Sequence, residues 1–88
     1  MSEIIWSDEA WEDYLYWQTQ DKKTLKRINA LIKDIARGGV LEGLGKPEAL
    51  TGDLRGEYSR RIDERNRLVY HMEDGRICIA ACRTHYGE

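Results

Sequence analysis

The clearest pattern in the chain is an apolar stripe at helical spacing in its second quarter. Its members are Leu25, Ile28, Leu31, Ile32 and Ile35. Lysine and arginine side chains lie outside the stripe, so the segment is predicted to be an amphipathic helix with one buried face. The pair Gly38 and Gly39 predicts the end of this helix, because glycine commonly follows a helix C-terminus.

A second helix is predicted before this one. Glu3 to Trp6 is a strand candidate, and Ser7 then offers a hydroxyl that can cap a helix. Asp8 and Glu9 follow, where the positive end of the helix dipole favours carboxylates. The polar stretch TQDKK at 19–23 separates the two helices. They are therefore expected to form a hairpin with an acidic first arm and a basic second arm.

Strand patterns dominate the second half of the chain. Three candidates cover residues 57–62, 67–72 and 76–83. The Asp74-Gly75 pair between the last two is a strong hairpin signal, and the segment DERN makes another short connection. These short connections predict an antiparallel meander.

Alternation orients the middle strand of this meander. It places Leu68, Tyr70 and Met72 on one face, and Arg67, Val69 and His71 on the other. In the last strand both faces are apolar, which is typical of a central strand.

The segment 40–53, between the helices and the meander, is predicted to be a long irregular loop. It is rich in glycine and holds the only proline, Pro47. Loops of this length are uncommon in compact domains and often carry function. Glu48 in this loop is therefore a candidate for chemistry.

Together these elements predict an α+β fold, in which an N-terminal strand and an α-helical hairpin pack on a twisted antiparallel β-sheet. At 88 residues, 41% of them apolar, the chain is expected to be one domain, 1–88. Its longest apolar run, Ile77 to Cys82, is too short to span a membrane, and the acidic N-terminus does not resemble a signal peptide. A cytoplasmic location with no membrane partner is therefore expected.

The two cysteines, Cys78 and Cys82, are expected to be buried, reduced thiols. Four residues apart on a strand, their Cα atoms lie roughly 13 Å from each other, too far for a disulfide. Their spacing misses the common zinc patterns, and His71 does not complete one. No metal site and no cofactor are predicted.

Charge is distributed unevenly along the chain, although the net charge is only -2. Residues 1–20 carry five acids and no base, whereas 21–46 carry seven bases and three acids. Residues 47–88 carry seven arginines, eight acids and no lysine. Arginine binds phosphate through two parallel hydrogen bonds, although solvated ion pairs also account for such a stretch.

The polar side chains outside the helices form a set suited to phosphoryl chemistry. They are Glu48, Arg60, Arg61, Arg65, Arg67, His85 and Tyr86. The set contains a carboxylate, guanidiniums, an imidazole and a phenol, but no nucleophile with an obvious base. RNA supplies its own nucleophile, the 2′-hydroxyl, so a base, an acid and an arginine are enough to cleave it.

Along its whole length the chain resembles the YoeB toxins of bacterial toxin–antitoxin systems, within the RelE-like superfamily. The matching stretches, which span residues 4 to 86 in order, are IIWSDEAWEDYLYWQTQDKK, RINALIKD, GKPEAL, YSRRI, RNRLVY and IAACRTHY. The resemblance implies a twisted sheet backed by an N-terminal helical hairpin. It also implies a metal-independent endoribonuclease that cuts messenger RNA in the ribosomal A site.

The resemblance also implies roles for five residues. Glu48, in the family's GKPE motif, would be the general base, and His85, in the terminal HY, the general acid. Arg67 would stabilise the transition-state phosphate, and Arg61 would assist in binding it. Tyr86 would hold or orient a base at the cut.

The implied partners are a YefM-like antitoxin, the ribosome and messenger RNA. Family members can form homodimers, and operator DNA would be contacted only through the antitoxin. Trp11, Tyr14 and Trp17 are expected to be core residues or antitoxin contacts.

Two other functions compete with this reading: a catalytically weak antitoxin-binding co-repressor module, and an RNase that acts without ribosomes. For Arg61 and Arg67, ion pairs with nearby acids are the structural alternative. Those acids are Glu57, Asp63 and Glu64. Arg60 and Arg65 are expected to be surface arginines.

The chain departs from the family pattern in three respects. Thr51 stands where the family often has a lysine, and the net charge is negative where the family tends to be basic. Gly87 and Glu88 extend beyond the usual terminal tyrosine. Weaker or more salt-sensitive binding to ribosomal RNA is expected from these changes.

Overall fold

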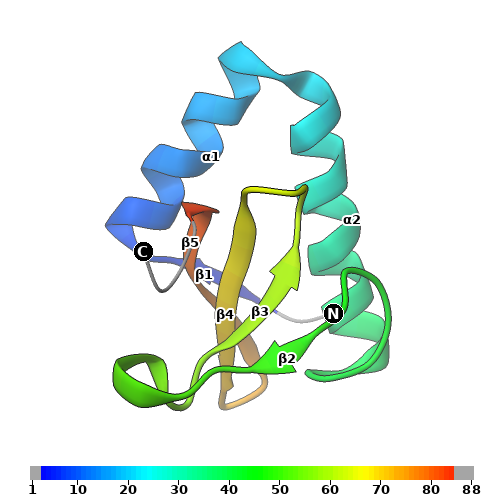
Figure 1. The fold of residues 1–88 in the computed structure, drawn as a ribbon, viewed down its shortest axis with the longest axis vertical. Coiled ribbons are helices and arrows are strands. Elements are labelled where there is room, and N and C mark those ends of the chain that lie inside the picture. The colour runs from blue at the N-terminus through cyan, green and yellow to red at the C-terminus, as the bar shows by residue number, and fades with distance from the viewer. Residues whose placement is uncertain (1–2, 85–88) are drawn as a thin grey trace.

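The computed structural model describes residues 3–84, which form two helices and a five-stranded sheet (Figure 1). The helices are α1, Asp8–Gln20, and α2, Lys22–Gly38. The strands are β1 (Ile4–Trp6), β2 (Glu48–Ala49), β3 (Tyr58–Arg61), β4 (Arg67–Glu73) and β5 (Arg76–Thr84). A 3₁₀ turn, η1, covers Gly52–Leu54. The predicted α+β fold with its helical hairpin is confirmed.

The sheet has the strand order β1-β5-β4-β3-β2, so β5 is central as predicted. The meander β3-β4-β5 is antiparallel, but β1 pairs with β5 in parallel, so the expectation of an antiparallel sheet is wrong for this edge. Parallel neighbouring strands need a long connection between them. The helical hairpin is part of the connection that joins β1 to β5.

Local signals at the helix ends form as expected. The Ser7 hydroxyl accepts a hydrogen bond from the Ala10 N–H at 3.0 Å and donates one to the Ala80 carbonyl on β5 at 2.8 Å. Asp21 caps α2 by accepting from the N–H groups of Lys23 and Thr24. The Ser7 side chain therefore caps α1 and also connects its start to β5.

The main core lies between the helices and one face of the sheet. The apolar stripe of α2 packs there with Leu68 and Tyr70 of β4 and with Ile77, Ile79 and Cys82 of β5. On the opposite face, which we call the open face, the described residues form a small buried apolar cluster of Leu50, Val69 and Ala81. The helical hairpin thus covers one face and leaves polar positions of β3 and β4 on the other.

Arg60 is the largest fully buried side chain within residues 3–84, and its exposed fraction is 0%. Its placement at the surface by sequence reasoning is therefore wrong, whereas Arg65 is exposed as expected. Alternation points Arg60 toward the helices together with Tyr58, because the next residue on each side, Ser59 and Arg61, belongs to the open face.

All five N–H donors of the Arg60 guanidinium find acceptors. Nε donates to the Tyr70 hydroxyl at 2.9 Å, and Nη1 donates to Asp34 Oδ2 at 2.7 Å and the Leu44 carbonyl at 3.1 Å. Nη2 donates to the carbonyls of Gly39 and Glu42 at 2.8 and 2.7 Å. One side chain thus binds α2, β4 and the following loop together.

The loop after α2 folds around this guanidinium. Asp34 Oδ2 also accepts from the Leu44 N–H at 2.8 Å, and the Tyr70 hydroxyl donates to the Val40 carbonyl at 2.6 Å. Gly43 is required there because a Cβ atom would lie 1.8 Å from Asp34 Oδ2. Segment 40–53 is mostly irregular as expected, but hydrogen bonds fix its first part, residues 39–45, which we call the held turn. The sequence did not predict β2 within this segment or η1, which begins in it at Gly52.

Replacement of Arg60 tests this arrangement. We expect Arg60→Lys to lower the free energy of unfolding by about 2–4 kcal/mol, because an ammonium group cannot serve five fixed acceptors and leaves buried groups without partners. Arg65→Lys, at an exposed position, should change it by less than about 0.5 kcal/mol. Urea unfolding measures both variants, and equal midpoints would contradict the role assigned to Arg60.

Asp34 predicts an acid-dependent loss of stability. The hydrogen bond from the Leu44 N–H, followed by that from Arg60, holds the pKa of Asp34 below its ordinary 3.8. A lowered native pKa stabilises the fold above 3.8, and this contribution is lost as the pH falls through the native value. The stability difference between wild type and Asp34→Asn should therefore shrink as the pH drops below about 4, as followed by urea unfolding at a series of pH values. A difference that stays constant over this range would contradict the prediction.

Candidate functional site

Glu48 lies at the edge of the sheet, on the open face. It begins β2, where it is directly opposite Ser59 of β3, and it is exposed. The held turn comes shortly before it: the Arg61 N–H donates to the Gly45 carbonyl at 2.6 Å. Glu48 is therefore presented by a strand rather than by an irregular loop.

Arg61 and Arg67 face each other across β3 and β4. They are direct partners in the antiparallel ladder, so their Cβ atoms are about 4.5–5.5 Å apart on one face. Arg61 is exposed and Arg67 is half-buried. Glu48 is opposite Ser59, two residues along β3 from Arg61, which puts the carboxylate diagonally next to the arginine pair.

Arg67 bonds to backbone carbonyls, although its charge also lowers the pKa of the nearby Asp63. Within residues 3–84, no ion pair joins Arg61 or Arg67 to a carboxylate. Arg67 Nη1 instead donates to the backbone carbonyls of Asp63 and Asn66, at 3.0 and 3.2 Å. The ion pairs considered from the sequence are thus not formed, and two positive charges lie side by side on the open face.

The turn between β3 and β4 holds this pair in register. Asp63 Oδ1 accepts from the N–H groups of Arg65 and Asn66, at 2.8 and 2.6 Å. An acidic side chain that bonds its own backbone in this way replaces a backbone turn. The DERN segment therefore sets the position of Arg67.

Residue 84 ends β5 directly opposite Arg67. The backbone row Arg61, Arg67, Thr84 therefore crosses three strands at one end of the open face. His85 and Tyr86, the predicted acid and base-orienting residue, lie outside the described residues, as do Gly87 and Glu88.

The aromatic and cysteine predictions are confirmed in part. Trp17 is buried and its Nε1–H donates to the Cys82 carbonyl at 2.8 Å, whereas Trp11 is 45% exposed. Both thiols are free, but only Cys82 is fully buried, and Cys78 is partly exposed on the open face. Burial, followed by the charge of Asp13, raises the pKa of the Cys82 thiol to about 12.

Sequence reasoning missed a second polar cluster on the open face. His71 and Glu73 of β4 lie close to Cys78 of β5, their direct or diagonal partner across the hairpin. The signal was present: a His-x-Glu pair shares one face of a strand, and the predicted turn folds Cys78 back onto it. Counting spacing along the chain alone concealed this contact.

The fold of this chain matches solved structures of toxins from toxin–antitoxin systems. The computed structure has a TM-score of 0.91 to the YoeB-YefM complex from Staphylococcus aureus, at 51% identity, covering 98% of this chain and 99% of that one. A YoeB dimer structure from S. aureus matches equally well, at 53% identity with coverages of 97% and 98%. The fold is thus that of the RelE-like toxins of toxin–antitoxin systems.

Sequence relatives narrow the class further. Residues 6–86 match the family described as YoeB-like toxin of bacterial type II toxin-antitoxin system. The chain is 57% identical to "Toxin YoeB" of Escherichia coli strain K12 over 83 residues, which cover 94% of this chain and 98% of that protein. The chain belongs to the YoeB-like toxin family. None of the helices within residues 3–84 is long and apolar enough to cross a membrane.

The facing arginines predict a response to anions. Like charges directly opposite in a sheet destabilise it by a few tenths to about 1 kcal/mol, so Arg61→Gln should raise the thermal midpoint slightly at low salt. Added pyrophosphate should stabilise the wild type more than Arg61→Gln, because the anion binds between two guanidiniums. Thermal unfolding with and without pyrophosphate measures this, with Arg55→Gln, an exposed arginine outside the pair, as the control. An equal rise of the thermal midpoint on adding pyrophosphate to wild type and to Arg61→Gln would contradict the prediction.

Proposed function

We propose that this toxin is a messenger RNA endoribonuclease that acts in the ribosomal A site and so inhibits translation. The observation that carries the proposal is the facing Arg61–Arg67 pair on the open face, which forms no ion pair with a carboxylate of residues 3–84, with Glu48 diagonal to it. A phosphodiester lying on the two guanidiniums would have a carboxylate within reach of the adjacent ribose. Membership of the YoeB-like family supports the same activity.

The proposed reaction uses the substrate's own nucleophile. Glu48 removes the proton of the 2′-hydroxyl, and the oxygen attacks the adjacent phosphorus. Arg67 stabilises the added negative charge on the phosphate in the transition state, with Arg61 assisting in binding. The bond from phosphorus to the 5′-oxygen breaks as His85 donates a proton to it. The products are a 2′,3′-cyclic phosphate and a 5′-hydroxyl, and no metal is needed in these steps.

Placement of the substrate needs more than the reacting groups. Tyr86 is proposed to hold a base at the cut, because aromatic rings bind unstacked RNA bases. The lysines of α2 offer a surface for ribosomal RNA, since Lys22, Lys23, Lys26 and Lys33 are all exposed. Thr51, near β2, adds no positive charge where the family often has a lysine, so we expect weaker binding to RNA.

We propose a YefM-like antitoxin as the partner, because the S. aureus relative of the same fold was solved in complex with YefM. The S. aureus YoeB dimer supports self-association as a further state. A toxin of this kind is proposed to act in the cytoplasm, where ribosomes are, and to reach operator DNA only through the antitoxin.

Mapping of messenger 5′-ends after induced expression tests the proposal. Wild type should produce new ends at A-site codons. Glu48→Gln, Arg67→Ala and His85→Gln should lower cleavage by about 10²–10⁴-fold, because each removes a group that acts in the transition state. The matched controls Glu42→Gln and Arg65→Ala change nearby exposed residues and should cleave as wild type does.

The same assay distinguishes the competing functions. Cleavage of naked RNA by purified protein, at the rate found with ribosomes, would contradict ribosome dependence. Expression that is harmless and leaves messenger ends unchanged would favour the antitoxin-binding co-repressor. A substrate with a 2′-deoxy sugar at the cut should stay intact, and its cleavage would exclude the 2′-hydroxyl route.

A further inference from the structure

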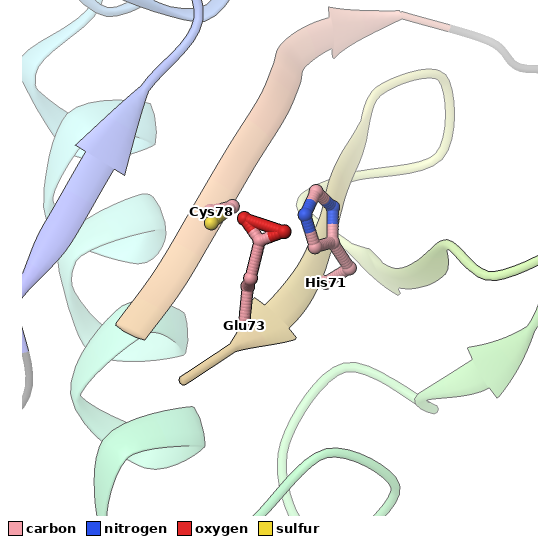
Figure 2. A group of neighbouring side chains, drawn as sticks. All are labelled: His71, Glu73 and Cys78. Carbon is pink, nitrogen blue, oxygen red and sulfur yellow. The ribbon is translucent and has the colours of Figure 1, made fainter. Parts of the chain in front are cut away.

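A cluster of metal-binding side chain types lies on the open face at the turn end of the β4-β5 hairpin. His71, Glu73 and Cys78 each offer one potential ligand atom, and these atoms lie within 4.8 Å of one another (Figure 2). His71 and Cys78 are direct partners in the ladder, and Glu73 is two residues along β4 on the same face. Figure 2 shows the three side chains pointing toward one another from the two strands.

A fourth residue, Glu57, lies against the imidazole. Its Oε2 lies 2.8 Å from His71 Nδ1. This close contact lacks hydrogen-bond alignment, and both His71 Nδ1 and Glu57 Oε1 are buried without a hydrogen-bond partner in the described chain. Buried polar atoms normally have partners, so the site is incomplete as a purely structural ion pair. A carboxylate on one ring nitrogen is the usual arrangement behind a metal-binding histidine.

Two carboxylates, those of Glu57 and Glu73, lie at the cluster. Arg76 is opposite Glu73 in the ladder, yet its Nε pairs with Glu3 on the chain before β1, at 3.1 Å. Within residues 3–84, the Glu73 carboxylate has no ion pair and no hydrogen bond. Two carboxylates and a thiol thus share a small volume with one imidazole.

The cluster is accessible. It borders a pocket of about 390 Å³ whose other walls are mainly apolar and include Leu54, Ile79 and Ala80. The protein therefore provides both the donor atoms and a path by which an ion can enter.

We propose that His71, Glu73 and Cys78 bind a divalent transition-metal ion of the zinc type, with Glu57 orienting the imidazole. Nitrogen, sulfur and carboxylate oxygen are the donors that Zn²⁺ takes in proteins, and three protein ligands leave a coordination position open toward the pocket. Hard cations such as Mg²⁺ and Ca²⁺ prefer oxygen alone, so the thiol and imidazole disfavour them.

This site is separate from the proposed RNA site. His71 is four residues along β4 from Arg67, roughly 13 Å at the rise of a strand. The ion would join β4, β5 and the segment before β3 by binding the folded protein only, so it would stabilise the sheet. The proposal departs from the expectation from the sequence, which took Cys78 as a reduced thiol and predicted no metal site with His71.

Cobalt titration tests the proposal, because Co²⁺ replaces Zn²⁺ and reports its ligands by colour. The full-length protein, reduced and freed of metal with a chelator, should bind one Co²⁺. Binding should give a sulfur-to-cobalt charge-transfer band in the near ultraviolet and the strong visible bands of tetrahedral cobalt. Added Zn²⁺ should abolish both, and it should raise the thermal midpoint of the wild type.

Matched variants locate the ion. Cys78→Ala should lose the charge-transfer band, and His71→Gln and Glu73→Gln should weaken binding at least tenfold, the lower end of the loss seen even for outer-shell partners. Cys82→Ala removes the other thiol, and Asp74→Asn removes the neighbouring turn carboxylate; both should bind as wild type does. Glu48→Gln should also bind normally, since the ion is not part of the RNA site.

Several results would overturn the inference. They are Co²⁺ spectra without a thiolate band, a band that survives in Cys78→Ala, or loss of binding in Glu48→Gln. Circular dichroism of each metal-free variant shows whether it folds. If Cys78→Ala fails to fold, Cys78→Ser provides the same spectroscopic test with a smaller change of volume. RNA cleavage is measured in parallel, so failure of one proposal does not decide the other.

Discussion

The buried guanidinium of Arg60 is the interaction on which the rest of the structure depends. Its five donors bind a carboxylate of α2, a hydroxyl of β4 and three carbonyls of the turn after α2. A planar, permanently charged group is suited to this, because it can serve acceptors from several directions without losing its charge. This turn leads into β2, which begins with Glu48. Arg60 therefore helps to fix the position of Glu48, although the two side chains lie on opposite faces of the sheet. Core and candidate site are thus linked through one strand, β3.

The second organising feature is the unequal covering of the two sheet faces. The helical hairpin covers one face with the main core, and the other face has the small apolar cluster of Leu50, Val69 and Ala81. Alternation then brings to the open face every second residue of β3 and β4, which includes Arg61, Arg67 and His71. Two separate polar groups of side chains result along β4 and its neighbouring strands. A cationic row lies at one end of β4, and a nitrogen, sulfur and oxygen cluster lies at the other.

Much of the fold could be predicted because its signals are local. The Ser7 cap, the apolar stripe of α2 and the Asp74-Gly75 hairpin each depend on neighbours along the chain, and all three formed where predicted. Arg60 could not be placed because a buried arginine is stabilised only by acceptors far away in sequence, such as Asp34. β2 was missed since two residues are too few to show alternation. The parallel edge was missed because pairing partners 73 residues apart, Ile4 and Ile77, leave no local trace.

The sequence by itself determined the helices, the meander, the family and the candidate residues, because periodicity, turn residues and motifs are properties of neighbouring positions. Tertiary structure decided which of those residues meet. It buried Arg60 and left Arg61 exposed, although the two are adjacent and chemically identical, because successive side chains of a strand point to opposite faces. It also brought Cys78 against His71 and Glu73, a contact hidden from spacing rules because a hairpin joins residues by register rather than by distance along the chain.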